Sequence, residues 1–276
     1  MTIGDMNTGL IHLRELTLKT NGVSDGEYPF NVQAIKNISR LTFEAPVTIF
    51  IGENGSGKST LLEGLAMAVG SVAIGREEID RDQAFKAVSP LATKMNLVWN
   101  KRTHRGFFLR AEDFFGFIHR IRSLRLEMLD EIIRIEQDYA DRSDHARTLA
   151  KGPAASSIQA MDNRYGEDLD AQSHGESFLT IFQSRFVPNG LYLLDEPEAA
   201  LSPLRQLGLI SLIKKMVLQD AQFILATHSP ILMAIPGAQI LDLDQSPPVY
   251  RDYQEIDQVV LYRAFLDDPE AFIRRL

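Results

Sequence analysis

The chain contains no cysteine, and this absence removes several kinds of chemistry at once. Disulfides, thiolate metal sites and cysteine nucleophiles are all excluded. The first residues carry no basic segment followed by an apolar core, so we expect no secretion signal. The most apolar long stretch, residues 223–243, includes a histidine, two prolines and an aspartate, which makes it a poor transmembrane helix. We therefore expect a cytoplasmic protein without membrane insertion.

An excess of positive charge is also missing. The 276 residues carry a formal net charge of −8, which argues against general binding to polyanions but leaves room for a local basic patch. Hydrophobic residues make up 45% of the chain and charged residues 24%, as in ordinary globular proteins. The length suits one large α/β domain or two small ones.

The most informative segment is Gly52–Thr60, which reads GENGSGKST and matches the phosphate-binding pattern G-x-x-x-x-G-K-[ST]. An apolar run precedes it and a helix-like stretch follows it, which is the strand–loop–helix context that this motif requires. Backbone N–H groups of such a loop surround phosphate oxygens, Lys58 adds positive charge, and the Ser59 hydroxyl binds Mg²⁺. The predicted nucleotide-binding residues here are Gly52, Asn54, Gly55, Ser56, Gly57, Lys58, Ser59 and Thr60.

Two further segments place polar side chains after buried strands. Asp195 and Glu196 follow the apolar run 191–194, at the strand end where open α/β sheets bind ligands. We predict that Asp195 holds Mg²⁺ and that Glu196 polarises the attacking water, although a strand followed by an acidic turn is the alternative. His228 follows the run 223–226 and is predicted to contact the γ-phosphate and orient the water; a structural histidine is the alternative.

A fourth segment, Gln172–Ser177, precedes a predicted helix. Ser173 and Gly175 would lie at the N-terminus of that helix, where backbone N–H groups favour anions. A capping box between Ser173 and Glu176 explains the same residues without any ligand. Both interpretations can hold together.

In their order along the chain, the four segments resemble the ATP-binding cassette (ABC) ATPases over residues 10–245. GENGSGKST matches Walker A, Leu191–Pro197 matches Walker B, residues 173–176 occupy the signature position, and His228 matches the switch histidine. The signature is usually Leu-Ser-Gly-Gly-Gln, and here His174 and Glu176 replace two of its members. The loop after Walker B usually ends in an aspartate, where this chain has Ser202.

The resemblance implies an α/β fold of the P-loop NTPase class, ABC ATPase type. It comprises a mixed sheet core, an antiparallel N-terminal β-subdomain and a helical subdomain. It also implies ATP and Mg²⁺ as ligands, Lys58, Glu196 and His228 as catalytic residues, and a homodimer that forms on ATP binding. In that dimer Ser173 and Gly175 of one copy would close over the γ-phosphate held by the other.

Two further residues are assigned by position within the resemblance. Glu112, after the apolar run 107–109, falls where the family has a glutamine that reaches Mg²⁺, although an ordinary acidic residue at a helix start is equally compatible. Tyr28 falls where an aromatic ring stacks on adenine, and Phe30 competes with it.

We expect one domain over residues 1–276. Residues 8–112 and 187–245 would form the nucleotide-binding core, with strands near 10–18 and 38–43 and a strand pair at 97–99 and 107–109. Residues 113–186 would form a helical subdomain with one or two helices between 114 and 139, a flexible loop at 151–171 and a helix at 177–186. Residues 246–276 would be a C-terminal extension.

Three stretches look like small stand-alone soluble cassette ATPases, often labelled AAA-family ATPases, which lie nearer to chromosome-maintenance and recombination ATPases than to transporter subunits. They are SHGESF, FFLRAEDFF and residues 262–272. Those larger relatives insert a long coiled coil between the two halves of the ATPase. Residues 113–170 are too few for a long antiparallel arm at about 1.5 Å per residue.

Charge is polarised along the expected helical region. Residues 101–125 carry seven basic and two acidic side chains, a net +5, whereas residues 127–144 carry a net −5. The basic segment suits nucleic acid or a protein partner, and a solvated helical surface with internal ion pairs is the alternative. We expect an ATPase that acts as a conformational switch on such a partner. A nucleotide-binding subunit of a membrane transporter and a slow nucleotide-gated binding module are the rival functions.

Overall fold

The computed structural model of the chain describes residues 9–19, 26–73, 83–165 and 174–274. Its main sheet has the strand order β5-β6-β7-β3-β8-β9, with the first five strands parallel and β9 antiparallel to β8. The strands are β3 (Val47–Ile51), β5 (Gly106–Arg110), β6 (Leu191–Asp195), β7 (Gln222–Ala226), β8 (Gln239–Asp242) and β9 (Val249–Arg251). This mixed sheet confirms the predicted α/β fold of the P-loop class.

A smaller antiparallel sheet lies beside the main one in the order β2-β1-β4. It contains β1 (Leu13–Leu18), β2 (Arg40–Thr42) and β4 (Met95–Trp99), and it confirms the antiparallel N-terminal β-subdomain. The predicted pairing of residues 97–99 with 107–109 is wrong, because β4 pairs with β1 while β5 pairs with β6. Four of the five β5 residues are buried, which favours a place in the covered parallel sheet.

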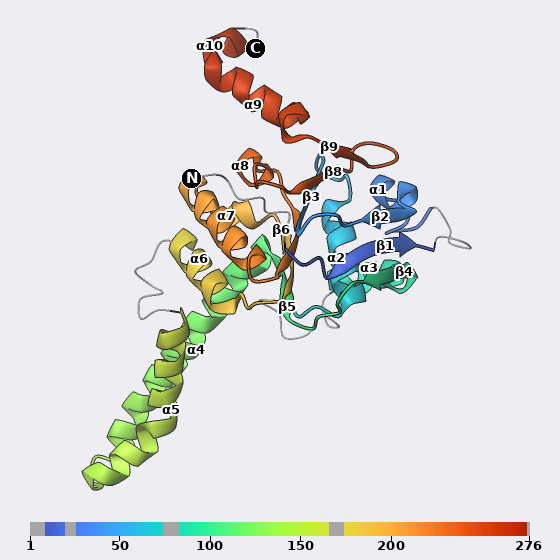
Figure 1. Cartoon of the computed structure of the whole chain (residues 1–276). Helices are drawn as coiled ribbons and strands as arrows, with labels where there is room; N and C mark the ends of the chain where they lie inside the picture. The colour runs from blue at the N-terminus through green and yellow to red at the C-terminus, as the bar shows by residue number, and fades with distance from the viewer. Residues whose placement is uncertain (1–8, 20–25, 74–82, 166–173, 275–276) are drawn as a thin grey trace.

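Helices cover both faces of the main sheet (Figure 1). On one face lie α6 (His174–Arg185), α7 (Pro203–Val217) and α8 (Pro230–Met233). On the other lie α2 (Lys58–Val69), α3 (Gln83–Lys94) and the small sheet, together with the short helix α1 (Gln33–Asn37). Alternate residues of β3 enter different cores: Ile49 packs with the α6–α7 side and Phe50 with the α2–α3 side. The parallel strands are therefore held from both faces, which fixes the positions of their carboxyl ends.

A two-helix hairpin projects from the body (Figure 1). It consists of α4 (Ala111–Asp138) and α5 (Asp144–Tyr165), and the 28 residues of α4 correspond to a length of about 42 Å. The single helix α4 agrees with the helical pattern of residues 114–139. The hairpin is a short antiparallel arm.

The flexible loop predicted for residues 151–171 is wrong over 151–165, which are helical in α5. Gly152, Pro153 and the serines after them are typical of turns. Ala154, however, is buried, and the Ser157 hydroxyl donates a hydrogen bond to the Pro153 carbonyl. Packing against α4 thus overrides local preference. Residues 166–171 lie outside the described residues, and the division into domains stays a prediction.

The C-terminal extension projects from the opposite end of the body (Figure 1). It continues from β9 through a 3-10 turn, Tyr253–Glu255, into α9 (Asp257–Asp267) and α10 (Pro269–Ile273). Ile256 and Val259 are buried in the main core, whereas most of α9 beyond them is exposed. In the part of the chain that the structure describes, no helix has the length and apolar composition needed to cross a bilayer.

Candidate nucleotide site

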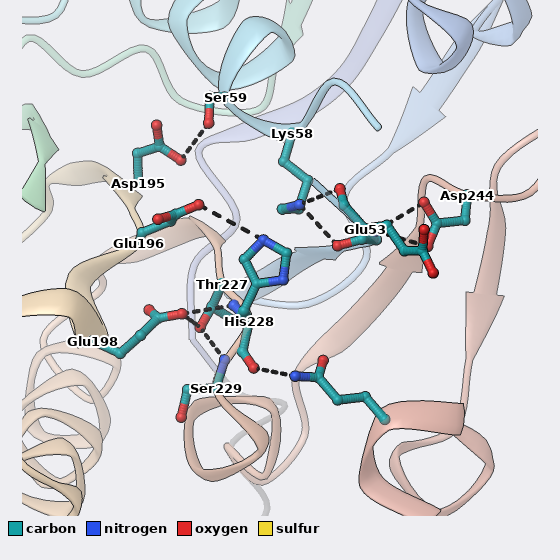
Figure 2. Close-up of polar contacts among 12 residues, drawn as sticks. Glu53, Lys58, Ser59, Asp195, Glu196, Glu198, Thr227, His228, Ser229 and Asp244 are labelled. Atoms are coloured by element: carbon teal, nitrogen blue, oxygen red, sulfur yellow. Dashed lines mark hydrogen bonds and ion pairs between the residues drawn. The ribbon is translucent and has the colours of Figure 1, made fainter. Parts of the chain in front are cut away.

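The predicted phosphate loop connects β3 to α2 (Figure 2). Gly57 has φ of 106° and begins the helix from a left-handed conformation. A Cβ atom at this position would lie 2.5 Å from Val32 Cγ1, so both the backbone angle and the space require glycine. Residue 57 is thus the point where the loop turns into α2, and the free N–H groups of the first helical turn face the loop.

Lys58 lies across this loop. Its Nζ donates hydrogen bonds to the carbonyls of Gly52 at 2.8 Å and Glu53 at 2.9 Å. Burial lowers the pKa of Lys58, and the carboxylates of Glu196, Asp244 and Asp195 act in the opposite direction. An anionic phosphate beside Nζ would stabilise the charged amine further.

Ser59 and Asp195 meet as the sequence predicts. The Ser59 hydroxyl donates to Asp195 Oδ1 at 3.1 Å (Figure 2). Burial of the Asp195 side chain raises its pKa from 3.8 to about 7, while the hydrogen bond from Ser59 and the charge of Arg110 act against that rise. A hydroxyl and a carboxylate are oxygen ligands of the kind that Mg²⁺ prefers, and the cation would offset the cost of burying this charge. The residues therefore fit the predicted metal.

Glu196 and His228 face each other on the more open side of the site. Glu196 Oε1 lies 3.7 Å from His228 Nε2, and their side chains are 45% and 31% exposed. The Glu196 backbone is left-handed, with φ and ψ both 48°. Such a conformation costs about 1 kcal/mol or more for a residue with a side chain, and it clusters at functional sites. Buried Asp195 and accessible Glu196 are neighbours with different surroundings, which suits one metal ligand and one base.

Tyr28, the predicted adenine-stacking residue, lies beside the phosphate loop. Its hydroxyl is 3.3 Å from Thr60 Oγ1, and its side chain borders a cavity of about 250 Å³. Phe30, the competing aromatic residue, is buried in the core, whereas Tyr28 is 48% exposed; stacking of either ring on adenine stays a prediction. The other residues that line this cavity are Val32, Asn54, Gly55, Gly57, Lys58, Ser59, Thr60 and Glu196.

Three predicted site residues are not tested by this geometry. Ser173 lies outside the described residues, Gly175 is the second residue of α6, and Glu112 is the second residue of α4 with its side chain outside the described part. Their roles stay predictions.

The basic segment 101–125 does not form one face. Arg110 is buried and pairs with Glu63 at 2.6 Å, and Arg125 pairs with Asp162 of α5 at 3.1 Å. The alternative of internal ion pairs thus accounts for these two arginines.

Three features of the site escaped the sequence analysis. Glu198 accepts hydrogen bonds at 2.6 Å from both the Thr227 hydroxyl and the His228 N–H. Asp244, after β8, accepts from the N–H of Glu53 in the phosphate loop. The Arg110–Glu63 pair borders a second cavity, of about 480 Å³, together with Asp195. The sequence offered little signal beyond the position of Arg110 at the end of β5 and of Asp244 after β8, because these contacts join residues far apart in the chain.

Comparison with known families agrees with the strand–loop–helix reading of the site. Residues 30–106 match a family described as an AAA domain, and residues 103–234 match a family described as an AAA domain, putative AbiEii toxin, type IV TA system. The two matches together include every strand-end residue from the phosphate loop to His228.

The curated relatives are distant. The chain is 23% identical to the ribose import ATP-binding protein RbsA of Clostridium tetani over 76% of this chain and 39% of that protein. It is 24% identical to the energy-coupling factor transporter ATP-binding protein EcfA2 of Streptococcus pyogenes, over 72% of this chain and 67% of that protein. The chain thus spans well under half the length of the first of these relatives.

Among solved structures, the chain is similar to the Smc head domain of Pyrococcus furiosus, which was solved bound to the C-terminal domain of ScpA. The TM-score is 0.46 and the identity 13%, over 92% of this chain and 99% of that one. A nucleotide-free ATP-binding cassette from an ABC transporter gives a TM-score of 0.44 and 13% identity, over 91% and 96% of the two chains.

Proposed function

We propose that the chain is a P-loop ATPase of the ATP-binding cassette type, which binds ATP with Mg²⁺ and hydrolyses the bond to the γ-phosphate. The observation that carries this proposal is the convergence of Lys58, Ser59, Asp195, Glu196 and His228 at one edge of the main sheet (Figure 2). These side chains follow three neighbouring strands, β3, β6 and β7. Such an arrangement supplies a phosphate cradle, a metal site and a base within one small volume.

Each side chain has a separate part in the proposed reaction. Lys58 neutralises charge on the β- and γ-phosphates, and Ser59 and Asp195 would hold Mg²⁺, which supplies further neutralisation when it is bound. Glu196 accepts a hydrogen bond from the attacking water, and His228 orients that water and the γ-phosphate for in-line attack. Tyr28 stacks on the adenine ring.

We further propose that the site closes against a second copy of the chain. Glu196 and His228 are partly exposed, so a nucleotide held by one copy would leave its reacting end open to bulk water. A second copy that brings Ser173 and Gly175 to the γ-phosphate would exclude solvent and add N–H donors from a helix N-terminus. Hydrolysis would remove those contacts and open the dimer, which gives the switch.

The output of this switch is proposed to be a nucleic acid or a protein partner. Support comes from Lys101, Arg102 and Arg105, which are exposed on the segment before β5. Stimulation of ATP turnover by DNA or RNA should be lost in Arg102→Glu/Arg105→Glu, while turnover without nucleic acid is retained. Stimulation that survives both reversals would remove this segment as the contact.

A transporter role is the second candidate, because both curated relatives described above are named as ATP-binding proteins of import or transport systems. Copurification of the tagged chain with a multi-span membrane protein would favour it over the nucleic-acid or protein-switch role.

Turnover of Mg-ATP by the purified chain tests the catalytic proposal. Glu196→Gln should keep nucleotide affinity and lose turnover about a hundredfold or more, because the amide cannot act as the base. Glu270→Gln is a matched control on the exposed α10, where Glu270 pairs with Arg274 in the next helical turn. Equal turnover by Glu196→Gln and the parent chain would contradict the proposed role of Glu196.

A further inference from the structure

Two side chains form hydrogen bonds with the backbone of His228, one at its N–H and one at its carbonyl. Its N–H donates to Glu198 Oε1 at 2.6 Å, and its carbonyl accepts from Gln258 Nε2 at 2.7 Å. The histidine ring approaches Glu196 at 3.7 Å, which is longer than a hydrogen bond. The orientation of the ring toward Glu196 therefore depends on how its backbone is held.

Glu198 anchors the turn that carries the histidine (Figure 2). The same Oε1 atom also accepts from the hydroxyl of buried Thr227 at 2.6 Å, and that hydroxyl in turn accepts from the N–H of Ser229 at 3.0 Å. Hydrogen bonds to a carboxylate are about twice as strong as neutral ones. One carboxylate thus fixes three consecutive residues after β7 relative to the loop after β6.

Gln258 reaches His228 from the C-terminal extension. Ile256 and Val259 on either side of it are buried in the main core, and the Tyr253 hydroxyl donates to the Pro230 carbonyl at 3.2 Å. This part of the extension therefore packs against the main core beside the histidine, although the rest of α9 projects outward. Gln258 and His228 also border one cavity of about 700 Å³ together with Gly52 and Asn54 of the phosphate loop.

We propose that Glu198 and Gln258 are positioning residues for His228, so that the C-terminal extension completes the ATP site. Glu198 holds the amide end of the His228 peptide and Gln258 holds the carbonyl end. Neither side chain needs to touch the nucleotide, because both act through the histidine. The inference rests on the proposed ATPase activity.

The first test is a comparison of kcat with KM. Glu198→Ala should lower kcat about tenfold or more and leave KM for ATP within about twofold, because it removes hydrogen bonds to a charged acceptor away from the nucleotide. Glu198→Gln should recover part of this loss, since its amide oxygen still accepts from Thr227 and His228. Gln258→Ala should lower kcat about fivefold, as expected for one neutral hydrogen bond. Glu255→Ala, an exposed carboxylate on the same cavity, is the matched control and should keep the parent kcat.

The second test asks whether the two residues act through the histidine. In a His228→Ala background, Glu198→Ala and Gln258→Ala should cause little further loss of kcat, because non-additivity marks residues that work as a unit. A full, independent loss in that background would overturn the proposal, as would an unchanged kcat in both single variants.

A third readout separates this inference from the ATPase proposal, because it needs no turnover. Amide hydrogen exchange of the segment 227–229 should speed up in Glu198→Ala and Gln258→Ala but not in Glu255→Ala. Unchanged exchange would overturn the positioning role even if the parent hydrolyses ATP. A parent chain that shows no ATP turnover would instead contradict the proposed function. In that case, faster exchange in the two variants would still support the positioning of His228 by Glu198 and Gln258.

Discussion

The nucleotide site and the α4–α5 hairpin are built on opposite principles. The strands that end at the site are almost wholly buried: β3, β6 and β7 have no exposed residue. In the hairpin, by contrast, Leu126, Ile133 and Leu149 are more than half exposed. Parallel strands that are covered on both faces hold the residues at their ends in fixed positions. The projecting pair of helices has little core of its own to hold its residues in the same way.

The contacts of the two regions differ in the same way. At the site, hydrogen bonds join residues far apart in the sequence, as between Ser59 and buried Asp195. In the hairpin, α4 and α5 meet through ion pairs that remain partly exposed, Arg125 with Asp162 and Lys151 with Glu136. The site is thus suited to precise chemistry, and the hairpin is suited to presenting a surface without disturbing that chemistry.

Lys58→Ala should separate the two regions most sharply. The substitution removes the charge that crosses the phosphate loop, and we expect nucleotide affinity to fall about a hundredfold or more, because charge-assisted contacts to phosphate dominate such sites. Titration with a fluorescent ATP analogue measures this loss. Arg147→Ala, which removes an exposed ion pair with Asp144 in α5, should bind as the parent does. A similar loss in both variants would erase the distinction between site and hairpin.

Asp195→Asn should raise stability while it damages function. Burial raises the pKa of Asp195 from 3.8 to about 7, so the folded chain holds this proton to a higher pH than the unfolded chain. The stability linked to that proton is fully present below about pH 4 and is lost as the pH rises through 7. A pKa change from 3.8 to about 7 corresponds to roughly 4 kcal/mol as an upper limit.

Thermal melts in EDTA test this sign. The variant should melt above the parent at pH 8 and close to it at pH 4, because asparagine is neutral throughout. Mg-ATP should raise the Tm of the parent more than that of the variant, because the variant lacks a metal-binding charge. A parent Tm equal to or above that of the variant at pH 8 without metal would contradict the claim that burial of the Asp195 charge destabilises the fold.

The site was largely readable from the sequence because its residues follow strands. Lys58, Ser59, Asp195 and His228 each stand at a fixed place after an apolar run, and parallel strands bring such ends to one edge. Glu198 and Gln258 were not found, because their partners on the His228 peptide are set by tertiary packing and not by any local pattern.

The hairpin was harder to predict than the site. Gly152 and Pro153 favour a turn, yet the packing of α5 on α4 keeps them helical. The edge strand β5 was predicted from the sequence, but its partner β6 was not. An apolar run that includes Phe107 and Phe108 indicates a buried strand and does not indicate which strand pairs with it. Strand pairing depends on residues distant in the chain, and the local sequence does not contain that information.

Arg125→Ala should give the smallest effect, and one confined to the hairpin. It removes a partly exposed ion pair with Asp162, so stability should fall by about 1 kcal/mol or less. Faster amide exchange in α5 would report the local loosening, while ATP turnover should stay within about twofold of the parent. A large loss of turnover would show that the hairpin and the site are coupled even without a partner.

The central claim is that one copy of the chain holds only part of an ATP site. The most direct measurement is the molar mass of Glu196→Gln in solution at saturating Mg-ATP, by light scattering after gel filtration. We predict a dimer for this variant with ATP, and a monomer with ADP and for Lys58→Ala with ATP. A monomer for Glu196→Gln, under conditions where ATP binding is confirmed, would contradict the account.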